Sequence, residues 1–301
     1  MQTDFTKQIQ RNFIPGDKWI YYKLYCGHKT ADCLLTSVIK AVTEKFCTEK
    51  LIDKWFFIRY GDPHNHLRIR FHVNDISCIS TILCHLNESL QDFIRNKLVW
   101  KIQMDTYKRE LERYGGKTIE MSETIFYYDS DLVVKTLDML DGYEGEVIRW
   151  KFCLRIIDTL LSDFLFSTEQ KLSLLDDLQA GFSSEFKMNK DLKIQIDKKF
   201  RSERPGIENI LNRDLDPESE LLPLFVYLEE KSKKIQNIIN QILTIYQHKK
   251  SEVPLDSFLS SHIHMTCNRM FSSKQRLHEL VLYNFLYRYY KSEHARLKYQ
   301  K

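Results

Sequence analysis

The chain has 301 residues, of which 43% are hydrophobic and 29% are charged, a balance typical of a folded globular protein and not of a disordered chain. Its 45 basic and 41 acidic residues leave a formal net charge of +4, which is too small to indicate nucleic-acid binding. The sequence contains only nine glycines and no phosphate-binding loop or dinucleotide fingerprint, so it gives the nucleotide-binding α/β classes no support.

Targeting signals and cysteine usage indicate a cytoplasmic protein without a membrane span. The first ten residues contain no apolar core of a secretory signal, and no stretch approaches the ~18 uncharged apolar residues that a span requires. The seven cysteines are scattered and form no C-x-x-C pair, so we expect reduced thiols and no structural zinc site.

The first third of the chain has the pattern of strands joined by one or two crossover helices. Aromatic or alternating apolar residues predict strands at residues 19–25, 55–60, 66–73 and 100–104. Apolar spacing predicts a helix over residues 29–46, and Asp75 can cap a second helix that follows it. Gly115 and Gly116 are expected to break the regular structure after the last strand.

From about residue 120 the apolar spacing becomes helical and stays so. Helices are expected around residues 150–164, 235–245, 255–271 and 274–297. The charge-rich segment 183–220 contains Pro205 and Pro217, from which we expect a mobile connection. The predicted class is therefore α+β: a small, mainly antiparallel N-terminal sheet with crossover helices over about residues 1–118, then a mostly α-helical layer over about residues 119–301, in a single domain.

The segment HLRIRFHV at residues 66–73 alternates basic and apolar side chains. In a strand, His66, Arg68, Arg70 and His72 share one face, and the apolar side chains share the other. Two guanidiniums about 7 Å apart along a strand suit a ligand with two carboxylates, or one carboxylate and a developing oxyanion. The same alternation is common on the solvated face of an antiparallel sheet, so both interpretations stand.

Arg113 is a second candidate for anion binding. It lies just before Gly115 and Gly116, where a tight backbone could turn the side chain inward. An arginine beside a loop is ordinarily a surface residue, and the sequence alone does not separate the two.

His264 is the candidate for proton transfer. It shares a helix face with Asn268, four residues later, and a histidine in this place is either a core residue or a group that moves protons near neutral pH. Metal binding is not favoured, because His262 and His264 do not converge on a helix and no H-E-x-x-H motif occurs.

Four segments, in their order along the chain, resemble one family. They are FIPGDKWIYYKLY at residues 13–25, WFFIRYGDP leading into HLRIR at residues 55–70, ERYGG at residues 112–116 and HMTCNR at residues 264–269. Together they are similar to the C-terminal glutamate-elimination domain of class I lantibiotic dehydratases, which is also called the thiopeptide-type bacteriocin biosynthesis domain. The resemblance covers nearly the whole chain, and the one visible departure is Ser272, where the family often has a glycine.

The resemblance implies an activity and a set of site residues. In that family a separate domain uses glutamyl-tRNA to esterify Ser or Thr of a precursor peptide, and the elimination domain removes glutamate to leave dehydroalanine or dehydrobutyrine. The important arginines of the family fall on Arg68 and Arg70, which would bind the glutamyl moiety, and on Arg113, which would neutralise the leaving carboxylate. The important histidine falls on His264, as base or as acid. No metal or organic cofactor is implied, and the four residues are expected to meet around one cavity.

The resemblance also implies partners. We expect a precursor peptide and a separate glutamyl-tRNA-dependent glutamylating protein, because the chain is too short to hold that second activity; a cyclase is a further candidate. No direct contact with nucleic acid is expected. Two alternatives remain: the related enzyme of thiopeptide assembly that forms a pyridine ring by cycloaddition, and a non-catalytic subunit that binds the leader peptide or acts as a scaffold.

Overall fold

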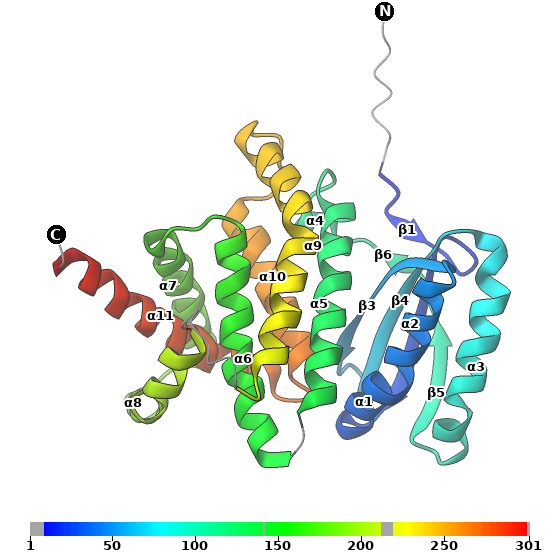
Figure 1. The fold of residues 1–301 in the computed structure, drawn as a ribbon, viewed down its shortest axis with the longest axis horizontal. Helices are drawn as coiled ribbons and strands as arrows, with labels where there is room; N and C mark the ends of the chain where they lie inside the picture. Colours follow the sequence, from blue (N-terminus) through cyan, green and yellow to red (C-terminus); the bar gives the residue numbers. More distant parts are fainter. Residues whose placement is uncertain (1–8, 141, 212–218, 300–301) are drawn as a thin grey trace, which may run out of the picture. The chain divides into compact units, whose positions relative to one another are not determined.

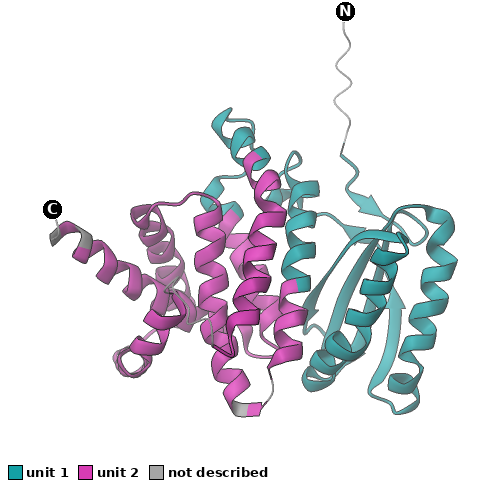
Figure 2. Cartoon of the chain, viewed as in Figure 1, with its two compact units in different colours: residues 1–131, 241–258 teal, residues 132–240, 259–301 magenta. Residues whose placement is uncertain are grey.

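A computed structural model describes residues 9–140, 142–211 and 219–299. The chain forms two compact units, shown in different colours in Figure 2. Unit 1 comprises residues 1–131 and 241–258, and unit 2 comprises residues 132–240 and 259–301. Three helices contribute residues to both units: α5 (Ile119–Met139), α9 (Leu222–Gln247) and α10 (Leu255–Met270).

Unit 1 is built on a four-stranded antiparallel sheet with the spatial order β3-β4-β2-β5 (Figure 1). The four strands are β2 (Trp19–Cys26), β3 (Ile52–Tyr60), β4 (His66–Val73) and β5 (Val99–Met104). A separate two-stranded ribbon pairs β1 (Asn12–Phe13) with β6 (Tyr107–Lys108). With a helical connection after β2 and another after β4, this order is the split βαβ arrangement, in which both helical connections cover one face.

The two helical connections between the strands pack on the apolar face of the sheet. The first connection is a continuous helical run of α1 (His28–Leu34), the π-helical η1 (Leu35–Ile39) and α2 (Lys40–Thr48); the second is the short η2 (Ile76–Cys78) followed by α3 (Ile79–Arg95). Asp75 caps the second connection, accepting a 2.9 Å hydrogen bond from the Ser77 amide as predicted. Phe46 of α2 packs edge-on against Phe71 of β4, with ring centres 6.2 Å apart.

A tight turn follows the short helix α4 (Leu111–Tyr114). Gly115 there has φ +70°, and a Cβ at this position would lie 2.9 Å from Thr118 Oγ1, so only glycine fits without strain. The next amide, that of Gly116, donates to Glu252 Oε2 at 3.3 Å. The predicted break is confirmed, and its cause is the left-handed backbone at the first glycine.

Unit 2 consists of helices and the turns between them in the residues that the structure describes. Besides its parts of α5, α9 and α10 it contains α6 (Gly142–Asp163), α7 (Thr168–Glu185), α8 (Lys190–Leu211) and α11 (Gln275–Tyr299). A capping box between Ser167 and Gln170 starts α7. Phe182 of α7 meets Tyr283 of α11 edge-on, with ring centres 5.0 Å apart. No helix among the described residues is long and apolar enough to cross a bilayer.

The predicted α+β class is confirmed, and the structure adds a helix, α8, that the sequence analysis did not predict. The segment 183–220 was expected to contain a mobile connection; α8 occupies residues 190–211 of it, with Pro205 inside the helix, and for residues 212–218, outside the described part of the chain, the expectation stays a prediction. The helix persists because its apolar stripe is buried at Ile196, Phe200, Ile207, Ile210 and Leu211, and that packing outweighs the lost backbone hydrogen bond. Pro217 lies outside the described residues.

Candidate functional site

The basic side chains of β4 lie on the sheet face opposite to α2 and α3. Since β4 pairs with β2 on one side and with β3 on the other, it is a central strand. The predicted alternation is confirmed, with its apolar members fully buried: Leu67, Ile69, Phe71 and Val73. The alternative of a solvated face is wrong for His66 and Arg70, which are only 4% and 7% exposed.

The guanidinium of Arg70 lies among three aromatic rings. Its Cζ is 4.4 Å from the ring centre of Tyr21, 4.8 Å from that of Tyr107 and 5.1 Å from that of Phe56. Its Nε is buried without a hydrogen-bond partner, and in the part of the chain that the structure describes no carboxylate pairs with it. Burial lowers the pKa of Arg70, and the charge of Arg68 acts in the same direction. Ring faces hold this cation, and the charge of Glu110, which acts on its pKa against burial, forms no ion pair with it among the described residues.

A second buried arginine of unit 1 has the opposite surroundings. Arg109 forms two 2.7 Å hydrogen bonds to the carboxylate of Glu123, which also accepts one of 2.9 Å from the hydroxyl of Tyr107. Burial alone would lower the pKa of Arg109, but the hydrogen bonds and charge of Glu123 outweigh it and raise that pKa. Glu123 is completely buried, so the pair is an internal structural contact.

Arg68 is held from two sides. Its Nε donates to His66 Nε2 at 3.0 Å, and its Cζ lies 3.4 Å from the ring centre of Tyr60. Its two terminal nitrogens have no hydrogen-bond or ion-pair partner among the described residues. Lys23 stands opposite Arg68 in β2 and pairs with Asp105. The hydrogen bond from Lys23 lowers the pKa of that carboxyl most, and the charges of both Lys23 and Arg68 lower it further.

Arg113 lies at the end of α4 and is exposed, with 52% of its side chain accessible. Its Nε is 3.1 Å from Glu110 Oε2, one helical turn earlier. The side chain of Arg113 therefore does not point inward, as the sequence had allowed. The residue lies in α4, before the glycine turn, and its side chain is on the outer face of that helix. Its charge is available at the surface of unit 1.

His264 on α10 is paired with a buried carboxylate of α11. Its Nδ1 is 2.7 Å from Glu279 Oε1, and Glu279 is 0% exposed, while 27% of the His264 side chain is accessible. A carboxylate that binds Nδ1 makes this nitrogen the protonated one in the neutral ring, so the lone pair is on Nε2. This Nε2 has no hydrogen-bond partner in the residues that the structure describes.

Further groups of α11 hold the Glu279 carboxylate in place. The Tyr283 hydroxyl donates to its Oε1 at 2.8 Å, and the Gln275 side chain donates to its Oε2 at 3.2 Å. Gln275 also accepts a 2.8 Å hydrogen bond from Asn268 and donates to the backbone carbonyl of His264 at 3.3 Å. The expected shared face of His264 and Asn268 is therefore present, and both residues contact α11 through one network.

The four residues predicted from the sequence are divided between the units. Arg68, Arg70 and Arg113 belong to unit 1, the first two on one strand face, and His264 belongs to unit 2. That all four serve one site stays a prediction.

Sequence reasoning missed the residues that orient the candidates. Glu279 is fifteen residues from His264 on another helix, and the only sequence signal is a polar row with helical spacing at Gln275, Glu279 and Tyr283. The rings around Arg70 come from β2, β3 and β6, and strand periodicity does not say which strands become neighbours.

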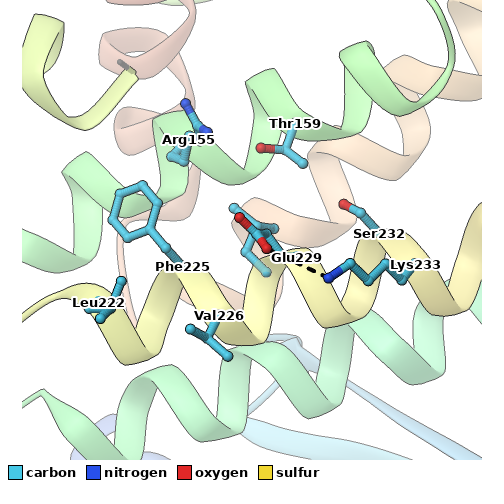
Figure 3. Close-up of a pocket in the computed structure, with 9 residues that line it drawn as sticks. Arg155, Thr159, Leu222, Phe225, Val226, Glu229, Ser232 and Lys233 are labelled. Atoms are coloured by element: carbon cyan, nitrogen blue, oxygen red, sulfur yellow. Dashed lines mark ion pairs between the residues drawn. The ribbon is translucent and has the colours of Figure 1, made fainter. Parts of the chain in front are cut away.

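A cavity of about 390 Å³ lies within unit 2 between α6 and α9 (Figure 3). Leu222, Phe225, Val226 and Leu228 line it, with polar groups from Arg155, Thr159, Glu229, Ser232 and Lys233. Several polar groups already have partners: Ser232 donates to Asp163 at 2.9 Å, and Lys233 Nζ is 3.8 Å from Glu229. None of the predicted site residues lines this cavity.

Metal-ligating side chains do not cluster in the described residues: no group of three or more His, Cys, Asp or Glu is placed to hold an ion. The charged groups of the candidate residues and their partners are guanidiniums, which bind anions, and an imidazole with the Glu279 carboxylate behind it, which moves protons.

Comparisons with known proteins agree on a family. The pattern of a family described as "Lantibiotic biosynthesis dehydratase C-term" matches residues 19–290. The subtilin biosynthesis protein SpaB of Bacillus subtilis is 25% identical over 272 residues, which are 89% of this chain and 25% of SpaB. The nisin biosynthesis protein NisB of Lactococcus lactis subsp. lactis is 24% identical over 287 residues, 88% of this chain and 26% of NisB. The chain thus spans about a quarter of the length of these relatives.

Solved structures share the fold at low sequence identity. The tRNA-dependent lantibiotic dehydratase MibB from Microbispora sp. 107891 matches with a TM-score of 0.70 and 20% identity, over 94% of this chain and 29% of MibB. TsrL matches at 0.65 with 12% identity, over 92% of this chain and 95% of TsrL. The pyridine synthase TbtD from thiomuracin biosynthesis matches at 0.65 with 9% identity, over 91% of this chain and 99% of TbtD.

Proposed function

The chain belongs to the lantibiotic biosynthesis dehydratase C-terminal family, and from this membership we propose that it is a lyase that removes glutamate from glutamylated Ser or Thr of a precursor peptide. One observation on this chain's own residues supports the proposal. Arg70 is a buried guanidinium without a carboxylate partner among the described residues, next to Arg68 on the same strand face, whose terminal nitrogens are also unpaired there. A protein keeps such charges at a cost in stability unless a ligand neutralises them.

The proposed reaction is a β-elimination without change of oxidation state. A base takes the Cα proton of the esterified residue, the electron pair forms the Cα–Cβ double bond, and the Cβ–O bond breaks. Glutamate leaves as a carboxylate, and the peptide retains dehydroalanine from Ser or dehydrobutyrine from Thr. The two needs of this step are a base and fixed positive charge at the enolate-like and carboxylate oxygens.

The arginines of unit 1 supply the positive charge in this proposal. Arg68 and Arg70 bind the glutamyl moiety, and the exposed Arg113 neutralises the carboxylate that develops as the C–O bond breaks. Guanidiniums suit this task because they present several donors in a plane and stay charged even when buried. Ring faces around Arg70 orient the cation without cancelling its charge.

His264 is the proposed base. With Nδ1 bound to the Glu279 carboxylate at 2.7 Å, the neutral ring carries its lone pair on Nε2, and the imidazolium formed after proton transfer is stabilised by this carboxylate, whose other oxygen lies 3.5 Å from Arg276. The leaving carboxylate has little need of a proton at neutral pH, which favours a base over an acid at this position.

The proposal requires partners. The substrate is a precursor peptide that already carries glutamyl esters, and a separate glutamyl-tRNA-dependent glutamylating protein is the proposed source of these esters. A cyclase that acts on the dehydrated product is a further proposed partner.

A second candidate function is the cycloaddition that forms a pyridine ring. The observation in its favour is length, since TsrL and TbtD match this chain over nearly their whole length. Sequence favours elimination, because SpaB and NisB match at 24–25% identity and TsrL and TbtD at 9–12%. A non-catalytic peptide-binding subunit would not need unneutralised arginines in its sheet.

The test is direct. Purified protein is incubated with a peptide that carries glutamyl-Ser or glutamyl-Thr esters, and mass spectrometry follows the loss of one glutamic acid per ester. We expect dehydrated peptide with wild-type protein and accumulated ester with His264→Ala. Stable esters with wild-type protein would contradict the proposal, and a parallel incubation with a bis-dehydroalanine peptide decides for or against the cycloaddition.

A further inference from the structure

His66 is almost completely buried beside Arg68, with 4% of its surface exposed. Its Nδ1 lies 2.7 Å from the backbone carbonyl of His64, and its Nε2 lies 3.0 Å from Arg68 Nε. A carbonyl only accepts and a guanidinium Nε only donates, so Nδ1 carries the proton and Nε2 is the acceptor. These two contacts select a single neutral tautomer.

Aromatic rings fix both partners of this hydrogen bond. The His66 ring stacks on Tyr25, with centres 4.6 Å apart and an angle of 29°, and it meets Tyr60 at 5.5 Å. The Arg68 guanidinium lies over the same Tyr60 ring, with its Cζ 3.4 Å from the ring centre. His66 therefore sets the direction of the Arg68 side chain, and Tyr60 sets the plane in which the guanidinium lies.

The choice of a neutral acceptor has a chemical consequence. A carboxylate at position 66 would hold Arg68 equally well but would cancel its charge, as Glu123 does for Arg109. A neutral imidazole occupies Nε alone, and it leaves the two terminal nitrogens of Arg68, which have no partner among the described residues, as donors for a ligand.

We propose that His66 is a positioning residue that holds Arg68 without forming an ion pair with it and aims its terminal nitrogens at a carboxylate of the substrate. The identification of that carboxylate with the glutamyl group rests on the proposed elimination. His66 itself does not take part in proton transfer, because both of its nitrogens are engaged.

The charges around His66 keep it neutral. Burial lowers its pKa most, and the charges of Arg68 on its own strand and of Lys23 on β2 lower it further, against the hydrogen bond to His64, which raises it. Lys101 on β5 lies over Tyr25, the ring on which His66 stacks, and adds positive charge on that side.

Steady-state kinetics on the glutamylated peptide test this role with two variants and one background. His66→Phe keeps the stacked ring and removes the acceptor, and we expect KM to rise about threefold to tenfold, the size of one hydrogen bond, with kcat nearly unchanged. His66→Gln offers an amide oxygen to Arg68 and should recover part of the loss. In an Arg68→Met background His66→Phe should have no further effect, because its only route to the substrate is gone. Equal KM for wild type and His66→Phe, or an undiminished effect in the Arg68→Met background, would overturn the inference.

A structural measurement separates this inference from the proposed function. Long-range ¹⁵N–¹H NMR of histidine rings in the free protein at pH 7.5 reports which nitrogen of His66 carries the proton, with His66→Phe identifying the signal. We expect the Nδ1–H tautomer, and an Nε2–H tautomer or an imidazolium at that pH would refute the proposed role. If wild-type protein eliminates no glutamate, the proposed function fails while the NMR result still decides the state of His66.

Discussion

The candidate arginines of unit 1 and the candidate histidine of unit 2 have opposite electrostatic surroundings. In unit 1, Arg70 and Arg68 are held by aromatic rings and by a neutral histidine, with no carboxylate partner among the described residues. In unit 2, the imidazole of His264 is held by a carboxylate that is itself completely buried. Fixed cations without counter-charge are suited to receive an anion, and an imidazole with a buried counter-charge is suited to receive a proton.

Unit 1 itself contains one buried arginine with a carboxylate partner and one without such a partner among the described residues. Arg70 and Arg109 are both more than nine-tenths buried, and Tyr107 is linked to both: its ring lies beside Arg70, and its hydroxyl donates to Glu123, the partner of Arg109. Arg109 has Glu123 as its partner, so its charge serves the fold, whereas Arg70 has ring faces only. The presence or absence of a carboxylate, and not burial, therefore separates the structural arginine from the candidate ligand-binding one.

The largest expected effect is that of Arg70→Met. Removing this cation should lower kcat/KM for elimination about 10²–10³-fold, the size found when one fixed donor to a developing oxyanion is lost. The free energy of unfolding should stay within about 1 kcal/mol of the wild-type value or rise, because sulfur–aromatic contacts replace the cation–π contacts and an unpaired buried charge disappears. Peptide kinetics and urea denaturation measure the two quantities.

Arg109→Met is the matched control. It leaves Glu123 as a buried carboxylate without its ion partner, so the free energy of unfolding should fall by about 3–5 kcal/mol. If Arg70→Met is destabilised to the same degree, or eliminates as fast as wild-type protein, the distinction between the two arginines does not hold.

Glu279→Gln tests the other half of the comparison. The amide can donate to His264 Nδ1 as well as accept from it, so the tautomer is no longer imposed and the imidazolium loses its counter-charge. We expect kcat to fall about 10²-fold or more, by analogy with the loss of the carboxylate behind a catalytic histidine. Tyr283→Phe removes only the hydrogen bond to Glu279 and should cost about 1 kcal/mol of stability with a kcat close to that of wild type. Comparable losses of kcat in the two variants would show that packing, and not the carboxylate, is what matters.

Arg113 should give a smaller effect because it is exposed. For Arg113→Ala we expect kcat/KM to fall about tenfold, since solvent screens a charge at the surface of unit 1, and stability to change by less than about 1 kcal/mol. Glu110→Gln removes the carboxylate that lies 3.1 Å from Arg113 Nε and should leave the rate unchanged or raise it. A rate loss of the same size in Glu110→Gln would mean that the pair acts as a unit and that the charge of Arg113 is not the effective group.

The sequence predicted which segments form strands and helices better than it predicted which of these elements lie side by side. The strand at residues 66–73 was predictable because its alternation has a period of two, and the resemblance to the family supplied Arg68, Arg70 and His264. The burial of Arg70 was not predictable, since it depends on the β3-β4-β2-β5 order that places two strands beside β4. Glu279 was missed because its contact with His264 crosses from one helix to the next, and α8 was missed because Pro205 was given more weight than the buried stripe around it.

The smallest expected effect concerns His66 and the dependence of stability on pH. Burial lowers the pKa of His66 in the folded protein, so below the ordinary histidine pKa of about 6.5 the unfolded chain binds a proton that the folded chain does not. The stability associated with the neutral ring is thus complete above that pH and is lost as the pH falls through the folded pKa. In His66→Phe this contribution is absent, so the free energy of unfolding should fall less steeply between pH 7.5 and pH 5 than in wild-type protein. Urea denaturation at a series of pH values measures both slopes, and because all other titrating groups are shared, equal slopes would mean that His66 is protonated as easily in the folded protein as in the unfolded one.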